Sequence, residues 1–538
     1  MAPGRRLSRF VLVAAVCLFA FYLIQPFSSS LSSIDPASAI FYSDIVFKPS
    51  SFDWASVNQH YPPSSIRPLP NIENPDKFPP VQHNFSGYVH DVTTTLRQQA
   101  VRTAFLRSWN AYKQHAWLKD ELAPVSSRGK DTFGGWAATI VDGLDTLWIM
   151  GLQDEFAIAA SAAAQIDWSQ TSNAAANLFE ITIRHLGGLL SAYDLSGEPA
   201  LLQKAIELGN MLYMGFDTPN RMPPFWLEFY PAKKGSQLAG LNDPAASPCS
   251  LSLEFTRLSL LTGNPKYYDA VARINDFLEQ SQDESKIPGL WPKHINFRDK
   301  RVDQDAGFTL GALADSMYEY LPKMAALLGQ RDTAFQKMYR KAMASVEKHM
   351  LMQPMVPDGD KEGRNVLFVG DAHVREGRIE LAPESQHLTC FAGGMFGLGG
   401  KLFDEAKHVD IGERLARGCA WAYNAFPTGL MPEIFNIVAC HDGDSACRWD
   451  EDRWQAERTA NMPKGFKNTR DTRYILRPEA IESVFLLYRM TGKEDLRELA
   501  WRMFQAIMKA TETPLAYSAI SDVNVKQKTT KSDSMERH

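Results

Sequence analysis

Apolar side chains spaced three and four residues apart dominate the chain from about residue 88 onward. This spacing places them on one face of a helix. The segments that follow it are 90–117, 146–164, 177–193, 200–213, 251–261, 267–278, 309–328, 332–350, 412–426, 478–490 and 495–510. Few of the alternating stretches typical of strands lie between them. The pattern therefore predicts an all-α domain.

A loose repeat runs through these helices. Three of them end in Ser or Thr followed by Gly197, Gly263 or Gly492, and a second amphipathic helix follows each glycine. Glycine takes the left-handed conformation that ends a helix. Helical hairpins that close on themselves form an α/α barrel with a central cavity. An open solenoid is the alternative, but the repeats are too irregular for a standard solenoid period.

The N-terminus resembles a membrane anchor. Three arginines precede an apolar run over residues 10–24, which is slightly shorter than the roughly 17–25 residues of a membrane-spanning helix. We predict a cytosolic tail (1–9), a signal-anchor transmembrane segment (10–27), a poorly ordered Ser/Pro-rich stem (28–85) and a helical domain (86–538). A cleaved signal peptide is the alternative. In both cases the domain lies in the secretory lumen, and the anchor makes a single-pass type II membrane protein.

Composition limits the partners and the chemistry. Hydrophobic residues make up 45% of the 538 positions, which is ample for a large core. The net charge is −5 with both signs interspersed, so we expect no nucleic-acid partner. The sequence contains no His-Glu-x-x-His zinc helix, Walker A loop or complete Rossmann fingerprint. The glycine-rich run 393–400 indicates close helix packing rather than a phosphate-binding loop.

Cysteines and one sequon agree with an oxidising compartment. There are six cysteines, few enough for one or two disulfides in a large lumenal domain. Cys440 and Cys447 lie in one polar loop, where they could pair locally. Asn84 begins the single Asn-x-Ser/Thr sequon and is an expected glycosylation site.

Several acidic residues lie on otherwise apolar helix faces or close to another acid. Glu180 and Arg184 share a helix face that is otherwise apolar, so the pair is expected to be buried or to line a cavity. Asp315 and Glu319 form an acidic pair four residues apart, and like charges at this spacing repel unless a ligand or metal needs them.

Further acids lie at the ends of elements. Glu433 follows Met-Pro, and Glu479 and Glu482 lie at the N-terminus of a predicted helix, where the dipole favours the ionised form. Each acid alone is explained by a salt bridge or a helix cap. Together they predict a carboxylate-lined cavity for a polyol, and glycoside hydrolysis needs one protonated and one ionised carboxyl group.

Seven motifs occur in the order known from one family. They occupy residues 133–148, 177–193, 253–257, 314–316, 387–391, 432–433 and 476–483. On these motifs the chain, from about residue 88 to Met535, resembles the family forty-seven glycoside hydrolases, the class I α-1,2-mannosidases. The resemblance implies an all-α (α/α)7 barrel that removes α-1,2-linked mannose from high-mannose N-glycans with inversion. It also implies bound calcium (Ca2+), and we expect a monomer.

The resemblance assigns roles to the motif residues. Glu180 matches the general acid, acting through a water, and Glu479 matches the general base. Asp315 and Glu433 match further active-site acids. An inverting pair is expected roughly 6.5–9.5 Å apart. The residues that would line the sugar site are Arg184, Glu254, His387, Arg477, Glu482 and Leu313, and those that match the family's disulfide are Cys390 and Cys419.

Two positions bear on the subtype and on the metal. Relatives of the endoplasmic-reticulum type have Arg where Leu313 stands, whereas the Golgi and fungal type that trims several mannoses has Leu. Leu313 therefore predicts the broader type, while an endoplasmic-reticulum or Golgi membrane location stays open. The family continues past the Asp-Ser-Met segment at 533–535 into a further helix and a calcium-ligating Thr that have no counterpart here. We therefore assign no metal ligand and expect a barrel incomplete at its C-terminus. The alternative function is a catalytically impaired, glycan-binding relative.

Overall fold

Helices that follow one another in the chain pack in pairs in the computed structural model, which describes residues 45–70, 78–173, 175–329, 333–440 and 447–535. The longer helices are α2 (Val92–His115), α4 (Leu144–Ile149), α5 (Gln153–Ala163), α7 (Gly187–Ser196), α8 (Pro199–Tyr213), α11 (Ser252–Thr262), α12 (Lys266–Ser281), α13 (Asp315–Leu327), α14 (Ala334–His349), α15 (Phe391–Leu402), α16 (Ala406–Ala425), α18 (Glu479–Thr491) and α19 (Glu494–Thr511). The shorter ones are η2 (Trp54–Ser56), α3 (Ala138–Asp142), α6 (Leu178–Glu180), η3 (Ile181–Leu186), η4 (Met214–Phe216), α9 (Phe229–Lys234), α10 (Ala246–Cys249), η5 (Gly363–Asn365), η6 (Leu388–Cys390) and α17 (Glu451–Glu457).

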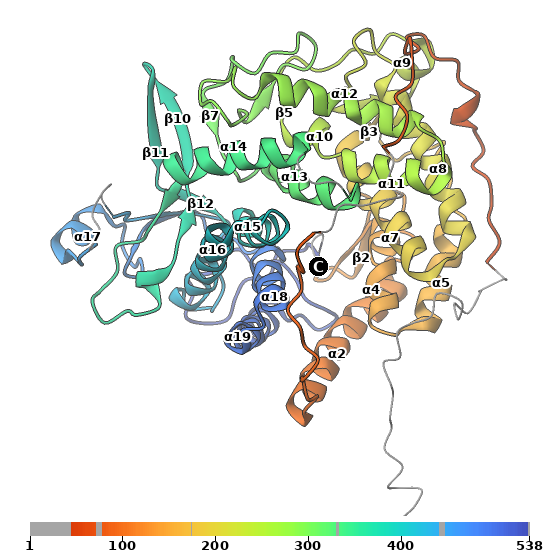
Figure 1. Cartoon of the computed structure of the whole chain (residues 1–538). Helices are drawn as coiled ribbons and strands as arrows, with labels where there is room; N and C mark the ends of the chain where they lie inside the picture. Colours follow the sequence, from red (N-terminus) through yellow and green to blue (C-terminus); the bar gives the residue numbers. More distant parts are fainter. Residues whose placement is uncertain (1–44, 71–77, 174, 330–332, 441–446, 536–538) are drawn as a thin grey trace, which may run out of the picture. The chain divides into compact units, whose positions relative to one another are not determined.

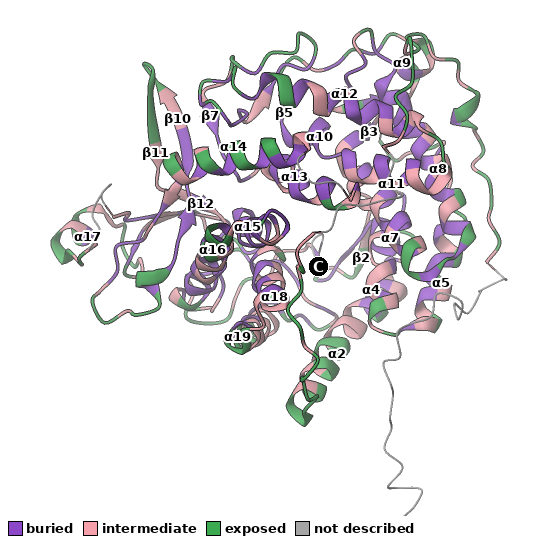
Figure 2. Ribbon diagram, in the orientation of Figure 1, coloured by how far each residue is buried: buried purple, intermediate pink, exposed green. Residues whose placement is uncertain are grey.

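These helices form two concentric layers. The helices α4, α7, α11, α13, α15 and α18 contact one another in this order as an inner ring (Figure 1). Each is followed in the chain by an outer partner that packs on it, namely α5, α8, α12, α14, α16 or α19. Figure 2 shows α15 buried along its length, while α14 and α19 keep exposed faces. The layers therefore confirm the predicted α/α design.

Glycines end the inner helices where the sequence predicts. Gly197, Gly263 and Gly492 follow α7, α11 and α18 with φ angles of 71°, 69° and 72°. In each case the glycine N–H bonds to the helix carbonyl four residues earlier, which satisfies one terminal acceptor. The chain can then turn sharply into the outer partner of the same hairpin.

The inner ring has one open side. Within the described residues no inner helix lies between α18 and α4. An apolar groove of about 990 Å³ lies there instead, and residues of α2, α4, α18 and α19 line it. The side chains of Ile149 and Phe485 are exposed at this groove. Apolar surface that other inner helices bury is therefore accessible on this side.

Two helices predicted from the sequence have different bounds in the structure. The segment predicted as one helix over 146–164 is broken into α4 and α5, because Gly151 takes a φ of 67° between them. The segment predicted as helical from residue 309 becomes helical only at Asp315. Leu313 has a φ of 85°, which an α-helix cannot contain.

Helix α15 was absent from the predicted helices, because five glycines weaken its apolar spacing. Those glycines allow close packing on α16, as the glycine-rich run predicts. A Cβ on Gly412 would lie 2.6 Å from the carbonyl oxygen of Gly393. The backbones of α15 and α16 therefore approach more closely than side chains would permit.

Short antiparallel strands connect the helical ends. They are β1 (Glu121–Ala123), β2 (Arg128–Lys130), β3 (Ala175–Asn177), β4 (Trp226–Glu228), β5 (Asp243–Pro244), β6 (His294–Ile295), β7 (Gly307–Phe308), β8 (Leu351–Met352), β9 (Phe368–Val369), β10 (Asp371–Arg375), β11 (Arg378–Ala382), β12 (Glu384–Gln386), β13 (Ile434–Ile437) and β14 (Phe466–Asp471). The two three-stranded sheets have the orders β11-β10-β7 and β12-β13-β14. The strand β13 leads directly from Glu433, and it holds that residue against the inner ring.

Residues 45–70, here called the strap, lie extended against the helical domain. The backbone N–H of Lys48 donates to the carbonyl of Ala164 (3.1 Å), and Ser50 donates to Glu207 through its N–H (2.9 Å) and its hydroxyl (3.0 Å). Trp54 is buried against Phe229. The prediction of a poorly ordered stem is therefore wrong for these residues, because the domain supplies partners for their backbone and apolar groups. The predicted anchor at residues 10–27 lies outside the described residues. Within those that are described, no helix has the length and apolar character needed to cross a membrane.

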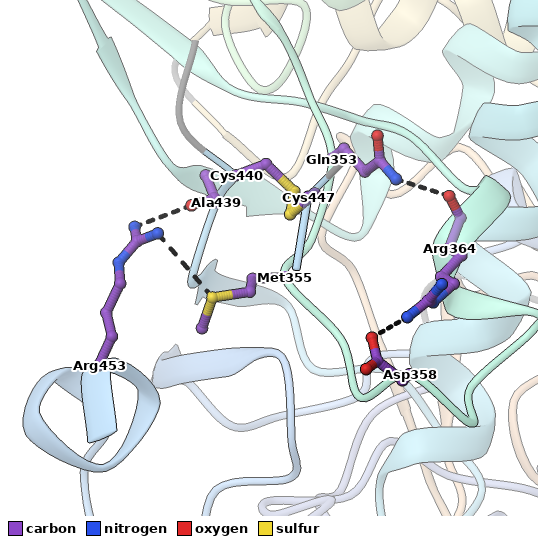
Figure 3. Close-up of a disulfide and its surroundings, with 8 residues drawn as sticks. All are labelled: Gln353, Met355, Asp358, Arg364, Ala439, Cys440, Cys447 and Arg453. Atoms are coloured by element: carbon purple, nitrogen blue, oxygen red, sulfur yellow. Dashed lines mark hydrogen bonds and ion pairs between the residues drawn. A yellow bond between two sulfur atoms is a disulfide. The ribbon is translucent and has the colours of Figure 1, made fainter. Parts of the chain in front are cut away.

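Two disulfides tie segments of the C-terminal half. Cys390, at the start of α15, is bonded to Cys419 in α16. Cys440 is bonded to Cys447, so the local pairing considered from the sequence does form (Figure 3). Near the second disulfide the Arg453 guanidinium donates to the carbonyl of Ala439 (2.8 Å). The remaining described cysteine, Cys249, is buried as a free thiol.

Candidate active site

The start of α18 carries the centre of the candidate site. Arg477 lies just before the helix and Glu479 is its first residue. The Arg477 Nε donates to Glu433 Oε2 (2.6 Å), and Nη1 lies 3.6 Å from Glu479 Oε1. Leu476 holds a φ of 61°, a strained value for a branched side chain. The next residue, Arg477, thus lies between two carboxylates from different elements.

His387 contacts the same carboxylate from another side. Its ring is fully buried and its Nε2 lies 2.7 Å from the Tyr423 hydroxyl. Its Nδ1 lies 3.6 Å from Glu479 Oε2, which is longer than a hydrogen bond. Burial acts to raise the pKa of Glu479, but His387 and Arg477 outweigh it, and the pKa lies below the usual 4.5. Glu479 is therefore held as a carboxylate.

Asp315 is the first residue of α13 and has the opposite character. Burial, followed by the negative charges of Glu319 and Glu479, raises its pKa to about 6, although Arg477 acts in the other direction. Two residues earlier, Leu313 keeps a strained φ of 85° and its side chain is 39% exposed. The site thus contains one carboxyl group that tends to hold a proton beside one that is ionised.

Two further acids of the inner ring favour their protonated forms. Burial raises the pKa of Glu254 on α11 to about 7, although the Tyr320 hydroxyl donates to its Oε1 (2.8 Å). Burial, followed by the charge of Glu319, raises the pKa of Glu482 on α18 to about 7. Lys323 on α13 acts against both shifts. Both acids can therefore donate hydrogen bonds near neutral pH.

Glu180 lies on the next part of the inner ring, where a short α-turn (α6) continues into the π-helical segment η3. The Asn177 side chain caps this turn by accepting from the Glu180 N–H (3.0 Å). Arg184 Nε donates to Glu180 Oε2 (2.8 Å), as the predicted shared face requires. The Arg184 guanidinium also lies 3.6 Å from Asp142 and 4.4 Å above the Phe133 ring. π-Helical turns of this kind are frequent at functional sites.

The two groups of residues belong to adjacent inner helices. Gly187, three residues after Arg184, lies so close to Glu254 that a Cβ there would be 3.7 Å from the Glu254 carboxylate. The structure thus gathers Asp315, Glu254, Glu433, Glu479 and Glu482 with His387 and Arg477, and it places Glu180 and Arg184 on the neighbouring helix. The expected separation of Glu180 and Glu479 stays a prediction.

Sequence reasoning missed Lys323, Tyr320 and Tyr423. Lys323 Nζ lies 2.7 Å from Glu319 Oε1, so the acidic pair of α13 is accommodated by a lysine and not by a ligand alone. Its position four residues after Glu319 is a helical spacing that could have revealed it. The two tyrosines carry no comparable signal, because a buried Tyr usually fills a core.

Three carboxylate oxygens bear on the expected calcium. Glu254 Oε2, Glu433 Oε1 and Glu479 Oε2 are buried and receive no hydrogen bond from the described residues. Calcium prefers such oxygen ligands. The described part of the chain nevertheless contains no group of three His, Cys, Asp or Glu side chains close enough to hold a metal ion. A calcium ion here would need water or sugar oxygens to complete its shell, and the acid–base steps proposed below are independent of it.

Fold and site together describe an α/α toroid whose inner helices carry buried carboxyl groups with pKa values shifted in opposite directions, an arrangement typical of glycoside-cleaving enzymes. Residues 104–538 match the model of glycosyl hydrolase family 47. The α-1,2-mannosidase from Trichoderma reesei is a solved structure with a TM-score of 0.71 and 32% identity, covering 82% of this chain and 90% of its own. The chain belongs to glycosyl hydrolase family 47, and the predicted (α/α)7-barrel class is confirmed.

Individual relatives are about one third identical to this chain over the aligned residues. It is 35% identical over 445 residues to "Endoplasmic reticulum mannosyl-oligosaccharide 1,2-alpha-mannosidase" of Rattus norvegicus, covering 82% of this chain and 62% of the relative. It is 34% identical over 459 residues to "Mannosyl-oligosaccharide alpha-1,2-mannosidase" of Penicillium citrinum, covering 82% and 84%. The chain thus spans less than two thirds of the rat relative's length.

Proposed function

We propose that this chain is an inverting α-1,2-mannosidase that trims mannose from high-mannose N-glycans. The observation that carries the proposal is that two carboxyl groups of one site have pKa values shifted in opposite directions: burial raises the pKa of Asp315 to about 6, while His387 and Arg477 hold that of Glu479 below its usual range. Opposite shifts of this kind define acid and base partners in glycosidases. Family membership and the printed names of the relatives support mannose as the sugar.

In the proposed reaction Glu479 takes a proton from a water, which attacks the anomeric carbon. The bond from that carbon to the glycosidic oxygen breaks on the opposite face, and the leaving oxygen receives a proton. Glu180 acting through a water, or Asp315 directly, supplies this proton. One mannose is released with inverted configuration, and the charges balance because one proton is taken up and one is given.

The surrounding residues hold the reacting groups. Arg477 and His387 keep Glu479 ionised and oriented, and Arg184 orients Glu180. Glu254 and Glu482, each partly protonated near neutral pH because its pKa is about 7, donate hydrogen bonds to sugar hydroxyls in their protonated forms. Such donors position a polyol without adding negative charge next to the base.

Leu313 sets the breadth of trimming in this proposal. Its side chain is exposed beside Asp315 and offers no charged anchor for one glycan branch. Several α-1,2-linked mannoses would then be accepted in turn. Replacing Leu313 with Arg is expected to restrict the products to loss of a single mannose.

The cellular setting of the proposal follows the sequence and the relatives. We propose a single-pass anchor at 10–27 and a monomeric lumenal domain in the endoplasmic reticulum or Golgi. We also propose calcium dependence and glycosylation at Asn84, whose side chain is exposed and accepts from the Ser86 N–H (2.9 Å).

The test uses the full-length chain and a nine-mannose N-glycan, with calcium or with a chelator, followed by mass spectrometry. Stepwise loss of several mannoses, abolished in Glu479→Gln and retained in the exposed control Glu380→Gln, is the expected result. An unchanged glycan mass with all preparations folded would overturn the enzyme proposal. Glycan binding without any mass loss would instead identify the glycan-binding alternative.

A further inference from the structure

Three charged residues follow one face of α13 at intervals of four. Asp315 begins the helix, Glu319 follows one turn later, and Lys323 follows one turn after that. Lys323 Nζ lies 2.7 Å from Glu319 Oε1. A helix places residues at this spacing above one another. Lys323 is therefore linked to Asp315 through a single intervening carboxylate.

Lys323 faces the interior of the ring. Its side chain is 37% exposed although α13 is an inner helix. The negative charges that act on it after Glu319 come from Glu482 on α18 and Glu254 on α11. The helix α15 lies between α13 and α18 in the ring, so Lys323 senses Glu482 across the interior space. Lys323 therefore lies close enough to acids on three inner helices to interact with each of them.

The charge balance around Lys323 differs from that of a structural lysine. Burial alone would lower the pKa of Lys323, but Glu319, Glu482 and Glu254 outweigh it and raise the pKa. Lys204 on α8 also contacts a carboxylate, that of Glu207 (2.8 Å), but it donates to the Ile166 carbonyl as well (2.6 Å), and burial lowers its pKa. Lys323 thus differs from Lys204 because the neighbouring carboxyl groups outweigh the effect of burial on its pKa.

We propose that Lys323 is a positioning residue of the mannosidase reaction, whose ammonium fixes the Glu319 carboxylate one helical turn from Asp315 and thereby keeps the transferable proton on Asp315. The inference rests on the proposed function and deepens it. Glu319 does not contact a reacting atom. Its fixed negative charge disfavours the ionised form of Asp315, so Asp315 keeps its proton to a higher pH.

Charged groups from two regions of the chain act on Asp315. Asp315 experiences Glu319 from its own helix and Glu479 and Arg477 from the region of α18. Without Lys323, Glu319 would face Glu254, Glu482 and Asp315 with no cation in contact. The least costly relief is proton uptake by Glu319 itself. Asp315 would then lose the neighbouring negative charge and release its proton at a lower pH.

The experiment compares Lys323→Met, Lys323→Arg and the control Lys341→Met in the full-length chain. Lys341 on the outer helix α14 pairs with Asp283, and both side chains are exposed, so its replacement removes one surface charge. The readout is the pH dependence of kcat/KM on a high-mannose glycan, with melting temperature as the check on folding. In Lys323→Met we expect the pH at which kcat/KM begins to fall on the basic side to be lower by about one pH unit than in the wild type. In Lys323→Arg and Lys341→Met we expect this pH to be unchanged.

A second readout separates this inference from the proposed function. Infrared titration of the protonated carboxyl band, with Asp315→Asn used to identify the Asp315 contribution, reports the proton without turnover. In Lys323→Met the Asp315 contribution should disappear at a lower pH than in the wild type. A folded Lys323→Met variant with an unchanged titration overturns the inference, even if the wild type is inactive. If the wild type turns over the glycan and the basic limb of its kcat/KM profile lies at the same pH as that of Lys323→Met, the inference is overturned and the proposed function stands.

Discussion

Removal of Arg477 is expected to cost both stability and activity, and for separable reasons. The Arg477–Glu433 contact is the shortest ion pair of the site at 2.6 Å, and the side chains are only 11% and 7% exposed. Glu433 Oε1 already lacks a hydrogen-bond partner. In Arg477→Met, Oε2 would lose its partner as well, so a buried carboxylate would remain without any compensation.

The magnitude follows from this geometry. Breaking a buried ion pair by removing one partner costs about 3–5 kcal/mol, because the remaining charge stays desolvated. Such a loss is a large share of a total stability of about 5–15 kcal/mol. The control is Arg340→Met, which removes a guanidinium with a 2.8 Å contact to Glu405 on the surface (44% and 36% exposed). An exposed pair contributes at most about 1 kcal/mol.

Urea unfolding of the full-length chain, followed by tryptophan fluorescence, measures these losses. In the double variant Arg477→Met/Glu433→Gln the unpaired charge is gone, so at least half of the lost stability should return. Activity should not return, because Glu479 still lacks its nearby cation. If the free energy of unfolding falls no more in Arg477→Met than in Arg340→Met, the reasoning is refuted. It is also refuted if the double variant recovers none of the lost stability.

Three further outcomes follow from the structure. The kcat/KM should rise with pH as Glu479 ionises, below its usual 4.5, and fall as pH passes about 6, because Asp315 then loses its proton; a profile flat from pH 5 to 8 would contradict these roles. Cys390→Ser with Cys419→Ser should lower stability by about 2–4 kcal/mol in thermal unfolding, and an unchanged melting temperature would show that the bond constrains little. The open groove beside α18 should bind an apolar fluorescent dye, and Phe485→Glu should reduce that signal while far-ultraviolet circular dichroism stays constant.

Periodicity predicted most of the helices because each outer helix has one apolar face and one solvent face. The segments 200–213 and 495–510 match α8 and α19 within a few residues. Periodicity failed where both faces are buried. Helix α15 has almost no polar side, and its glycines carry no apolar signal, so only its packing on α16 identifies it as an inner helix.

The candidate site was predictable in its residue types and less so in its electrostatics. The spacing of Glu180 and Arg184 predicted a contact that the structure contains at 2.8 Å. The spacing of Asp315 and Glu319 predicted an acidic pair but not its relief by Lys323. Which acid holds a proton depends on burial and on charges from other helices, and neither is visible in a local spacing.

The sequence by itself determined the helical class, the glycine-ended hairpins and the family to which the seven motifs belong. These properties depend on residues close together in the chain, or on motif order alone. Only the tertiary structure decided that Arg477 joins Glu433 to Glu479, that the pKa values of Asp315 and Glu479 shift in opposite directions, and that the strap packs on the domain. Each of these depends on groups brought together from distant segments, because Coulombic interactions and desolvation act through space rather than along the chain.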